Sequence, residues 1–213
     1  MEVIPLSQVS IEEKVRCFNA AFSDYFVQIN MTADYFRERH QMGRVDYDYS
    51  FGIWAEGKLC AFIYSGLGSW AGAPTVYNAG TGVIPAFRGQ HLVSRIYETA
   101  LPFWAARGYR QTLLEVITDN VKAIRVYERV GFRKQRRFHI YSGLSDLPVS
   151  SAVPELDIQI VDRPDWAAYA PLLPFQPSWE YNQAGVEALI NGFHFLHAYV
   201  QGALQAFLIL QPQ

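Results

Sequence analysis

The segment Gly82–Ile96 constrains the fold of this chain more than any other stretch of the sequence. Its apolar pattern predicts a strand that ends at Ile84 and a long helix over about 90–107, with the basic loop around Arg88 and Gly89 between them. A helix N-terminus offers unpaired N–H groups and a partial positive charge. This arrangement suits an anion, above all a phosphate group, although an ordinary strand-to-helix turn has the same pattern.

A second strand and helix follow directly. Residues Gln111–Thr118 form a strand-like run, Asn120 is a candidate N-cap for a helix, and Gly131 ends it. Strands that alternate with helices indicate an α/β fold, with a mixed sheet that contains parallel strands joined by crossovers.

Weaker patterns complete the element order as βααβββαβαβ. Ser10 and Glu13 form a capping box before the first helix, and Glu56-Gly57 is typical of a hairpin turn. The remaining predicted elements are strands at 3–6, 49–55, 59–66, 76–84 and 132–141 and a helix at 32–41.

Composition excludes several classes of protein. The chain has 213 residues with a net charge of −2, which argues against non-specific binding of nucleic acids. Two isolated cysteines, Cys17 and Cys60, form neither a disulfide framework nor a metal cluster. The N-terminus lacks the features of a signal peptide, so we expect a cytoplasmic protein. Residues 188–213 carry no charge, but Gln201-Gly202 favours a hairpin turn there over a membrane span.

The charge distribution suggests two parts. Residues 1–149 carry 17 basic and 14 acidic side chains, whereas residues 150–213 carry 1 and 6. We therefore expect a first domain at 1–145, a linker at 146–156, and a C-terminal segment at 157–213. Gly57–Phe62 and Gly202–Phe207 share Gly, Leu, Ala and Phe at the same spacing. The C-terminal segment is thus a candidate partial repeat of the first strand, helices and hairpin, although short matches also arise by chance.

The most specific pattern lies in the second strand–helix unit. Asn120, Ala123, Tyr127, Gly131 and Phe132 match the signature Asn-x-x-Ala-x-x-x-Tyr-x-x-x-Gly-Phe, and the loop before the long helix matches Arg/Gln-x-x-Gly-x-Gly/Ala in part. Together these motifs resemble the GCN5-related N-acetyltransferases (the GNAT superfamily), over about residues 1–143. The resemblance implies the GNAT acyl-CoA N-acyltransferase fold, and a tandem protein whose second copy is incomplete.

The resemblance also implies an activity, namely transfer of an acetyl group from acetyl-CoA to a primary amine, with no metal. Tyr127 would protonate the leaving thiolate, Glu115 would act as base, and the Val83 N–H would polarise the thioester carbonyl. The residues that would contact the cofactor are Val83, Ile84, Arg88, Gly89, Gln90, His91, Leu92, Val93, Asn120, Ala123 and Tyr127.

Other interpretations of these residues stay open. His91 and Val93 stand where the family has small residues, so a degenerate domain that binds acyl-CoA or a protein partner without catalysis is the alternative function. Glu115 also fits an ion-paired strand residue, Tyr127 a core residue, and Asn120 a plain helix cap.

The sequence indicates the acceptor of the acetyl group less clearly than its donor, acetyl-CoA. Tyr25, Phe26 and Tyr77 are candidate acceptor-pocket residues, although core packing explains them equally well. The acceptor would be a small-molecule amine or a protein N-terminus. No nucleic-acid or membrane partner is expected. An exposed sheet edge in the C-terminal segment predicts that it pairs with the first domain or with a second chain, and the second case would be a homodimer.

Overall fold

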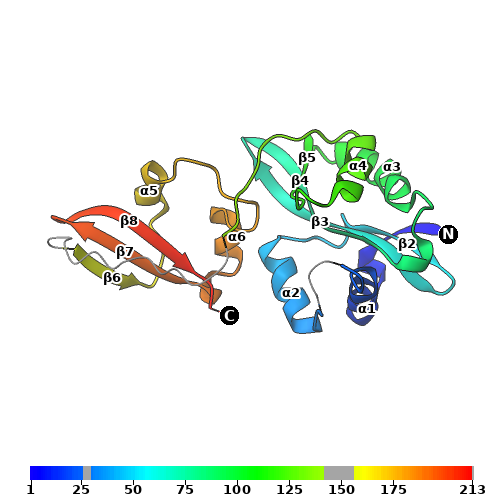
Figure 1. Ribbon diagram of the computed structural model, residues 1–213, viewed down its shortest axis with the longest axis horizontal. Coiled ribbons are helices and arrows are strands. Elements are labelled where there is room, and N and C mark those ends of the chain that lie inside the picture. Colours follow the sequence, from blue (N-terminus) through cyan, green and yellow to red (C-terminus); the bar gives the residue numbers. More distant parts are fainter. Residues whose placement is uncertain (26–29, 142–155, 213) are drawn as a thin grey trace. The chain divides into compact units, whose positions relative to one another are not determined.

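The structure, a computed structural model, describes residues 1–25, 30–141 and 156–212. The chain forms two compact units, Met1–Arg133 and Lys134–Gln213 (Figure 1). Each unit has its own sheet and is described separately.

The first unit is built on a five-stranded sheet with the order β1-β2-β3-β4-β5. The strands are β1 (Glu2–Pro5), β2 (Phe51–Ala55), β3 (Lys58–Trp70), β4 (Ala73–Val83) and β5 (Gln111–Leu114). The first three pairings are antiparallel and the β4–β5 pairing is parallel, as the strand–helix–strand pattern of the sequence predicts.

Helices cover both faces of this sheet. Figure 1 shows α1 (Ile11–Ala21) and α2 (Ala33–Met42) on one side, and α3 (Leu92–Ala105) and α4 (Val121–Arg129) on the other. Two short 3₁₀ turns, Leu6–Gln8 and Pro85–Phe87, precede α1 and α3. The core is apolar and rich in aromatic rings; Phe18 of α1, for example, stacks on Phe62 of β3 with centroids 5.8 Å apart. Burial of such faces is the main source of stability of a layered fold.

The helix starts follow the predicted caps. The Ser10 hydroxyl accepts from the Glu13 N–H at 3.2 Å, and Asn120 Oδ1 accepts from the Ala123 N–H at 3.1 Å. The reciprocal half of the predicted capping box is wrong. The Glu13 carboxylate instead accepts the Leu59 N–H at 2.6 Å and pairs with Arg16, because these donors tie α1 to the β2–β3 hairpin.

β4 and β5 are paired over only part of their length. β5 pairs with Thr75–Asn78 of β4, whereas β3 pairs with β4 as far as Val83. The β4 residues 79–83 therefore have no β5 partner, and among the described residues no other strand pairs with β4 on this side, which we call its open side.

Two strand predictions in this region need correction. The predicted strand 111–118 ends at Leu114, because the chain turns toward α4 directly after the last pairing with β4. The predicted strand 132–141 is wrong: residues 133–141 are exposed and pair with no strand among the described residues. Without a neighbouring strand the alternation of Phe138 and Ile140 has no face to bury, and Ile140 is 93% exposed.

The second unit contains a three-stranded antiparallel sheet, β6 (Leu156–Val161), β7 (His194–Val200) and β8 (Ala203–Leu210), in that order. Short helices lie between β6 and β7, namely α5 (Trp166–Tyr169), α6 (Gln183–Ala188) and 3₁₀ turns at Ala170–Leu172 and Ile190–Gly192. Across the described residues, no helix combines the length and apolarity that a membrane span requires.

The β7–β8 hairpin has the same register as β2–β3. Phe51 pairs with Ile63, and Leu196 pairs with Leu208, 145 positions later in each strand. Both hairpins have a register shift at matching places, after Ile53 and after Ala198. Their turns match too, since Glu56 and Gln201 both have a positive φ and precede a glycine with a positive φ.

The two faces of this second sheet differ in exposure. On one face Tyr169 of α5 stacks on Phe207, with ring centroids 3.8 Å apart. On the other face the side chains are apolar and exposed, with Ile158 59%, Ile160 79% and Leu208 50% accessible.

Candidate active site

The end of β4 presents backbone groups to its open side. The Ile84 N–H donates to Cys60 O of β3 at 3.0 Å. Successive N–H groups of a strand point to opposite sides, so the Val83 N–H points away from β3. The Val83 carbonyl lies on the same side and accepts from Arg88 Nε at 3.1 Å. The Val83 N–H therefore has the orientation that the predicted polarising role requires.

Arg88 is held by protein groups. Its guanidinium donates to both carboxylate oxygens of Asp24, at 2.6 and 2.7 Å, and to Ala21 O at 2.9 Å. These contacts fasten the loop to the end of α1. A direct charge–phosphate contact from this side chain would have to compete with them, so the loop around Arg88 offers an anion mainly its backbone.

The start of α3 supplies such backbone groups. The N–H groups of Leu92, Val93 and Ser94 lie in the first helical turn, where no intrahelical acceptor exists. Leu92 is buried, so its side chain belongs to the core. His91, the N-cap, has φ 56°, the left-handed region in which the family pattern has glycine. Gly89, at φ 78°, also lies in the left-handed region.

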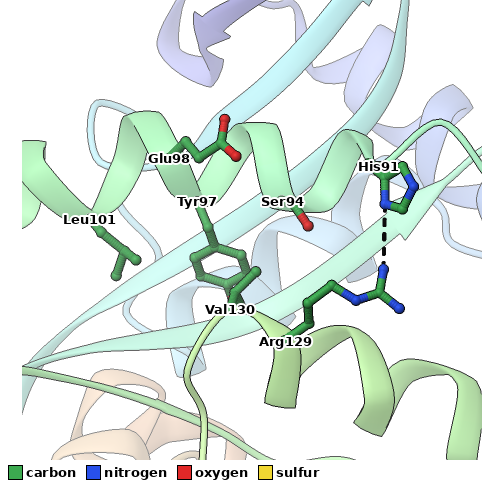
Figure 2. Close-up of a pocket in the computed structure, with 7 residues that line it drawn as sticks. All are labelled: His91, Ser94, Tyr97, Glu98, Leu101, Arg129 and Val130. Atoms are coloured by element: carbon green, nitrogen blue, oxygen red, sulfur yellow. Dashed lines mark hydrogen bonds between the residues drawn. The ribbon is translucent and has the colours of Figure 1, made fainter.

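A cavity of about 430 Å³ lies between α3 and α4 (Figure 2). Figure 2 shows His91, the N-cap residue before α3, and Arg129 of α4 pointing toward each other at one end of it. Nη1 of Arg129 lies 3.4 Å from Nδ1 of His91. The other lining residues are Ser94, Tyr97, Glu98, Leu101 and Val130. Of this set only His91 was a predicted site residue. The sequence signal for Arg129 is its place in the run 125–137, which is rich in Arg and Lys.

Tyr127 is a residue of α4 whose side chain packs against the core, with its ring 5.8 Å from that of Phe132. Burial raises the pKa of its hydroxyl, and hydrogen bonds with Thr81 and Asn78 of β4 offset part of that rise. The group therefore stays protonated at neutral pH, as a general acid must.

Glu115 lies one residue beyond the end of β5 and is exposed, so its predicted place within the strand 111–118 is wrong. β5 is shorter than its sequence pattern suggests, and Glu115 falls in the turn that follows. Its Oε2 accepts from the Tyr77 hydroxyl at 3.5 Å. Tyr77 itself is buried on β4.

The remaining predicted residues meet at the start of α4. Asn120 caps this helix and its Nδ2 donates to Tyr25 Oη at 3.4 Å, while Ala123 supplies the capped N–H. Phe26 lies outside the described residues. Among the described residues no three His, Cys, Asp or Glu side chains are grouped to hold a metal ion.

Tyr127 and Glu115 lie on opposite faces of the sheet. Neighbouring side chains of β4 alternate between faces, so Tyr77 and Asn78 point in opposite directions. Asn78 contacts Tyr97 of α3 and interacts with Tyr127, whereas Tyr77 contacts Glu115. The two candidate catalytic groups thus approach the end of the β4–β5 pairing from different sides.

Comparison with known sequences agrees with this geometry. The sequence model of the acetyltransferase (GNAT) family matches residues 13–132, more than half of the chain. The chain belongs to the GNAT family. The match spans α1 to the start of the segment after α4 and includes every candidate site residue discussed above.

Individual relatives of this GNAT chain are distant. N-alpha-acetyltransferase 30 of Schizosaccharomyces pombe is 31% identical over 65 residues, which are 30% of this chain and 43% of that protein. The chain thus spans less than half the length of this curated relative.

Solved structures share the fold. The aminoglycoside N-acetyltransferase AAC(6')-Iy, in complex with CoA, has a TM-score of 0.51 and 16% identity over 67% of this chain and 93% of its own. The aminoglycoside 6'-N-acetyltransferase AAC(6')-IG of Acinetobacter haemolyticus has a TM-score of 0.51 and 18% identity over 68% and 100%. Both confirm the predicted GNAT fold class.

Proposed function

We propose that this GNAT chain transfers an acetyl group from acetyl-CoA to a primary amine. The observation that carries the proposal is the placement of Tyr127 and Glu115 on opposite faces of the sheet, at the point where β4 and β5 part. A proton donor on one side and a proton acceptor on the other are what the reaction needs.

The residues at the end of β4 fit acetyl-CoA as substrate. The outward Val83 N–H and the open side of β4 over 79–83 can bind an extended, amide-containing chain by strand-like hydrogen bonds. The first turn of α3 can hold a pyrophosphate through its N–H groups. Gly89 and Gln90 are exposed beside it, and Ile84, Leu92 and Val93 form the apolar floor.

The chain's own groups account for the proton movements. Glu115, directly or through a water, removes a proton from the amine so that its nitrogen can attack the thioester carbonyl. The Val83 N–H stabilises the negative charge that develops on the carbonyl oxygen. As the C–N bond forms and the C–S bond breaks, Tyr127 donates its proton to the thiolate sulfur.

Two acceptor classes agree with the relatives named above. The fold neighbours are aminoglycoside acetyltransferases, which suggests a small-molecule amine, and the curated relative is an N-alpha-acetyltransferase, which suggests a protein N-terminus. Tyr77, whose hydroxyl contacts Glu115, and Tyr25, whose hydroxyl contacts Asn120, are our candidates for contacts with the acceptor. A panel of aminoglycosides, polyamines and N-terminal peptides, with detection of free CoA thiol, distinguishes the classes.

The decisive experiment compares the wild-type chain with Tyr127→Phe. We expect Kd for acetyl-CoA to stay within about twofold and kcat to fall by about 10²-fold, the usual contribution of a general acid. Acetyl-CoA binding without thiol release from any amine would favour the alternative, a non-catalytic acyl-CoA-binding or partner-binding domain. An absence of binding at millimolar acetyl-CoA would refute both.

We also propose the domain boundaries 1–145, 146–156 and 157–213, with the last part a partial copy of the first. The matched registers and turns of β2–β3 and β7–β8 support this organisation. The exposed apolar face of β6–β8 supports a role in assembly, in which a homodimer forms through the C-terminal segment.

A further inference from the structure

The cavity between α3 and α4 has at one end a cation that no carboxylate neutralises. This cation is the guanidinium of Arg129, whose Nη1 lies 3.4 Å from Nδ1 of His91 (Figure 2). In the part of the chain that the structure describes, no acidic side chain lies within ion-pair distance of Arg129. Glu98 lines the same cavity, but Figure 2 shows it pointing away from Arg129. The cavity therefore has room for an anion beside this guanidinium.

His91 is a weak partner for Arg129. A guanidinium can only donate, so as a hydrogen bond this contact requires His91 Nδ1 to be the nitrogen without a proton. The 3.4 Å separation is longer than a typical hydrogen bond, and the imidazole offers a single lone pair. The planar fork of an arginine instead matches two oxygens of one phosphate group. His91 thus occupies a donor that a phosphate would bind better.

Further donors lie at the same end of the cavity. His91 is the N-cap of α3, so the unpaired N–H groups of the first helical turn follow it directly. Ser94 of this turn also lines the cavity, and Figure 2 shows its hydroxyl on the side of α3 that faces α4. A fixed cation, a hydroxyl and the positive end of a helix together favour an anion with several oxygens, which is the chemistry of a phosphate.

The rest of the cavity suits a larger body than a phosphate group. Its walls include Leu101, Val130 and the ring of Tyr97, which is 1% exposed. The Tyr97 hydroxyl accepts from Asn78 Nδ2 at 2.8 Å, and this bond holds the ring in place. The volume of about 430 Å³ lies within the range of small-molecule sites. A ligand that fills it would carry its phosphate on a partly apolar body of nucleoside size.

We infer that this cavity binds a phosphate monoester carried on a nucleoside, and that Arg129 is the residue that recognises the phosphate. The phosphate replaces His91 as the acceptor of the Arg129 N–H groups. A monoester carries roughly two negative charges at neutral pH and has three free oxygens. Each phosphorus of a pyrophosphate linkage carries about one charge, so a single guanidinium distinguishes the two kinds of group.

The inference rests on the proposed function only for the source of the phosphate. In acetyl-CoA the pyrophosphate is the group for the N–H groups of α3, and the 3′-phosphate of the ribose is the monoester. A free nucleotide is the other source of the same chemistry. Neither source involves Tyr127 or Glu115, so binding at this cavity can be measured separately from acetyl transfer.

The test is isothermal titration of the full chain at constant ionic strength with CoA and with 3′-dephospho-CoA. We expect the wild type to bind CoA about fivefold to tenfold more tightly, the usual value of a hydrogen-bonded charge pair. Arg129→Met, which keeps most of the side-chain length and removes the charge, should lose this preference. Its Kd for dephospho-CoA should stay within about twofold of the wild-type value.

Arg125→Met is the matched control, because it removes the same charge from α4 at an exposed position that does not line the cavity. It should keep the preference for CoA, since an exposed charge contributes little at a distance. An equal loss of preference in both variants would show a general effect of charge and overturn the site. An equal loss of affinity for CoA and dephospho-CoA in Arg129→Met would assign Arg129 to the pyrophosphate and overturn it too.

Adenosine 3′,5′-bisphosphate and 5′-AMP separate the sources and need no acetyl transfer. Tighter binding of the bisphosphate, lost in Arg129→Met, supports the inference even if no amine is ever acetylated. The same preference without one between CoA and dephospho-CoA would identify a free nucleotide as the ligand. If the wild type showed a preference in neither pair, the inference would be wrong whatever the activity.

A double-mutant cycle tests the replacement of His91. If His91 competes with the phosphate for Arg129, His91→Gly should strengthen CoA binding more than dephospho-CoA binding. In the Arg129→Met background this difference should disappear, because the donor for which the two groups compete is gone. The same difference in both backgrounds would refute the competition for Arg129.

Discussion

Arg88 joins the loop before α3 to the end of α1, since its Nη1 and Nη2 lie 2.6 and 2.7 Å from the two carboxylate oxygens of Asp24. The same guanidinium holds the Val83 and Ala21 carbonyls. The site thus depends on a contact between segments 64 residues apart in the chain.

We predict that Arg88→Met weakens acetyl-CoA binding by roughly threefold to tenfold. Without the Arg88 contacts the loop is less ordered in the free protein, so ligand binding must supply the free energy that orders it. Isothermal titration measures Kd. Arg95→Met is the control, since Arg95 contacts Met1 rather than the loop. Equal Kd values for both variants would contradict the clamping role.

Glu115→Gln should lower kcat by about 10²-fold, because the amide cannot accept the amine proton. Steady-state kinetics with saturating acetyl-CoA is the measurement. Glu128→Gln, at an exposed position of α4, should leave kcat as it is. A wild-type kcat in Glu115→Gln would assign the base elsewhere.

His91→Gly should stabilise the first unit by about 1 kcal/mol, because a left-handed φ of 56° strains a residue with a Cβ. Calorimetry should show a midpoint about 2–4 °C higher. Gln90→Gly, next to it but without a positive φ, should lower the midpoint. Acetyl-CoA titration of the same variants shows whether the His91 side chain obstructs the ligand; we expect the affinity of His91→Gly to rise.

Stability should fall on the acidic side because of His40. Burial lowers the pKa of this imidazole to about 3, so the folded state keeps it neutral where the unfolded chain takes up a proton. The contribution is fully present above the unfolded pKa of about 6.5 and is lost as the pH falls toward about 3. Between pH 7 and 5 the free energy of unfolding should drop by about 2 kcal/mol from this group.

Urea unfolding at the two pH values checks the His40 prediction. In His40→Gln the drop between pH 7 and 5 should shrink by that amount, even if the variant is less stable throughout, because its Tyr47 contact is altered. An unchanged pH dependence would show that another group titrates.

The exposed face of β6–β8 should cause self-association through the C-terminal segment. Ile158 pairs with Ala198 and Ile160 with Leu196, so these side chains share one apolar face of the sheet. Exposure of this face to water is unfavourable and favours its burial against a second copy. Sedimentation velocity at increasing concentration should show dimers for the wild type and monomers for Ile158→Lys with Ile160→Lys. Gln159→Lys, on the opposite face, should still dimerise. If the wild-type chain were still monomeric at about 100 μM, the dimer would have a Kd weaker than that concentration, and the homodimer proposal would be refuted.

Much of the fold could be predicted from signals that lie within a few residues of one another. Ser10, Thr32 and Asn120 cap helices because their side chains bond N–H groups three residues away, a contact that needs no distant partner. Glu56-Gly57 and Gln201-Gly202 form turns for the same reason, since their backbone conformation is a property of two residues.

The ends of strands could not be predicted from the sequence, because a strand exists only where another strand pairs with it. Gln111–Thr118 is strand-like over its whole length, yet it is a strand only to Leu114, where its pairing with β4 ends. Phe132–Tyr141 is also strand-like in part and pairs with no strand among the described residues. The same limit applied to Glu115, which the sequence places within the strand and the structure places one residue beyond its end.

The sequence by itself therefore determined the element types as far as α4, the GNAT family and the choice of Tyr127 and Glu115 as candidates, because these rest on residue type and short spacing. Only the tertiary structure decided what the candidates do to one another. Asn78 of β4 donates to the Tyr97 hydroxyl of α3, and Asp24 pairs with Arg88. Both depend on contacts between segments far apart in sequence, whose geometry packing sets.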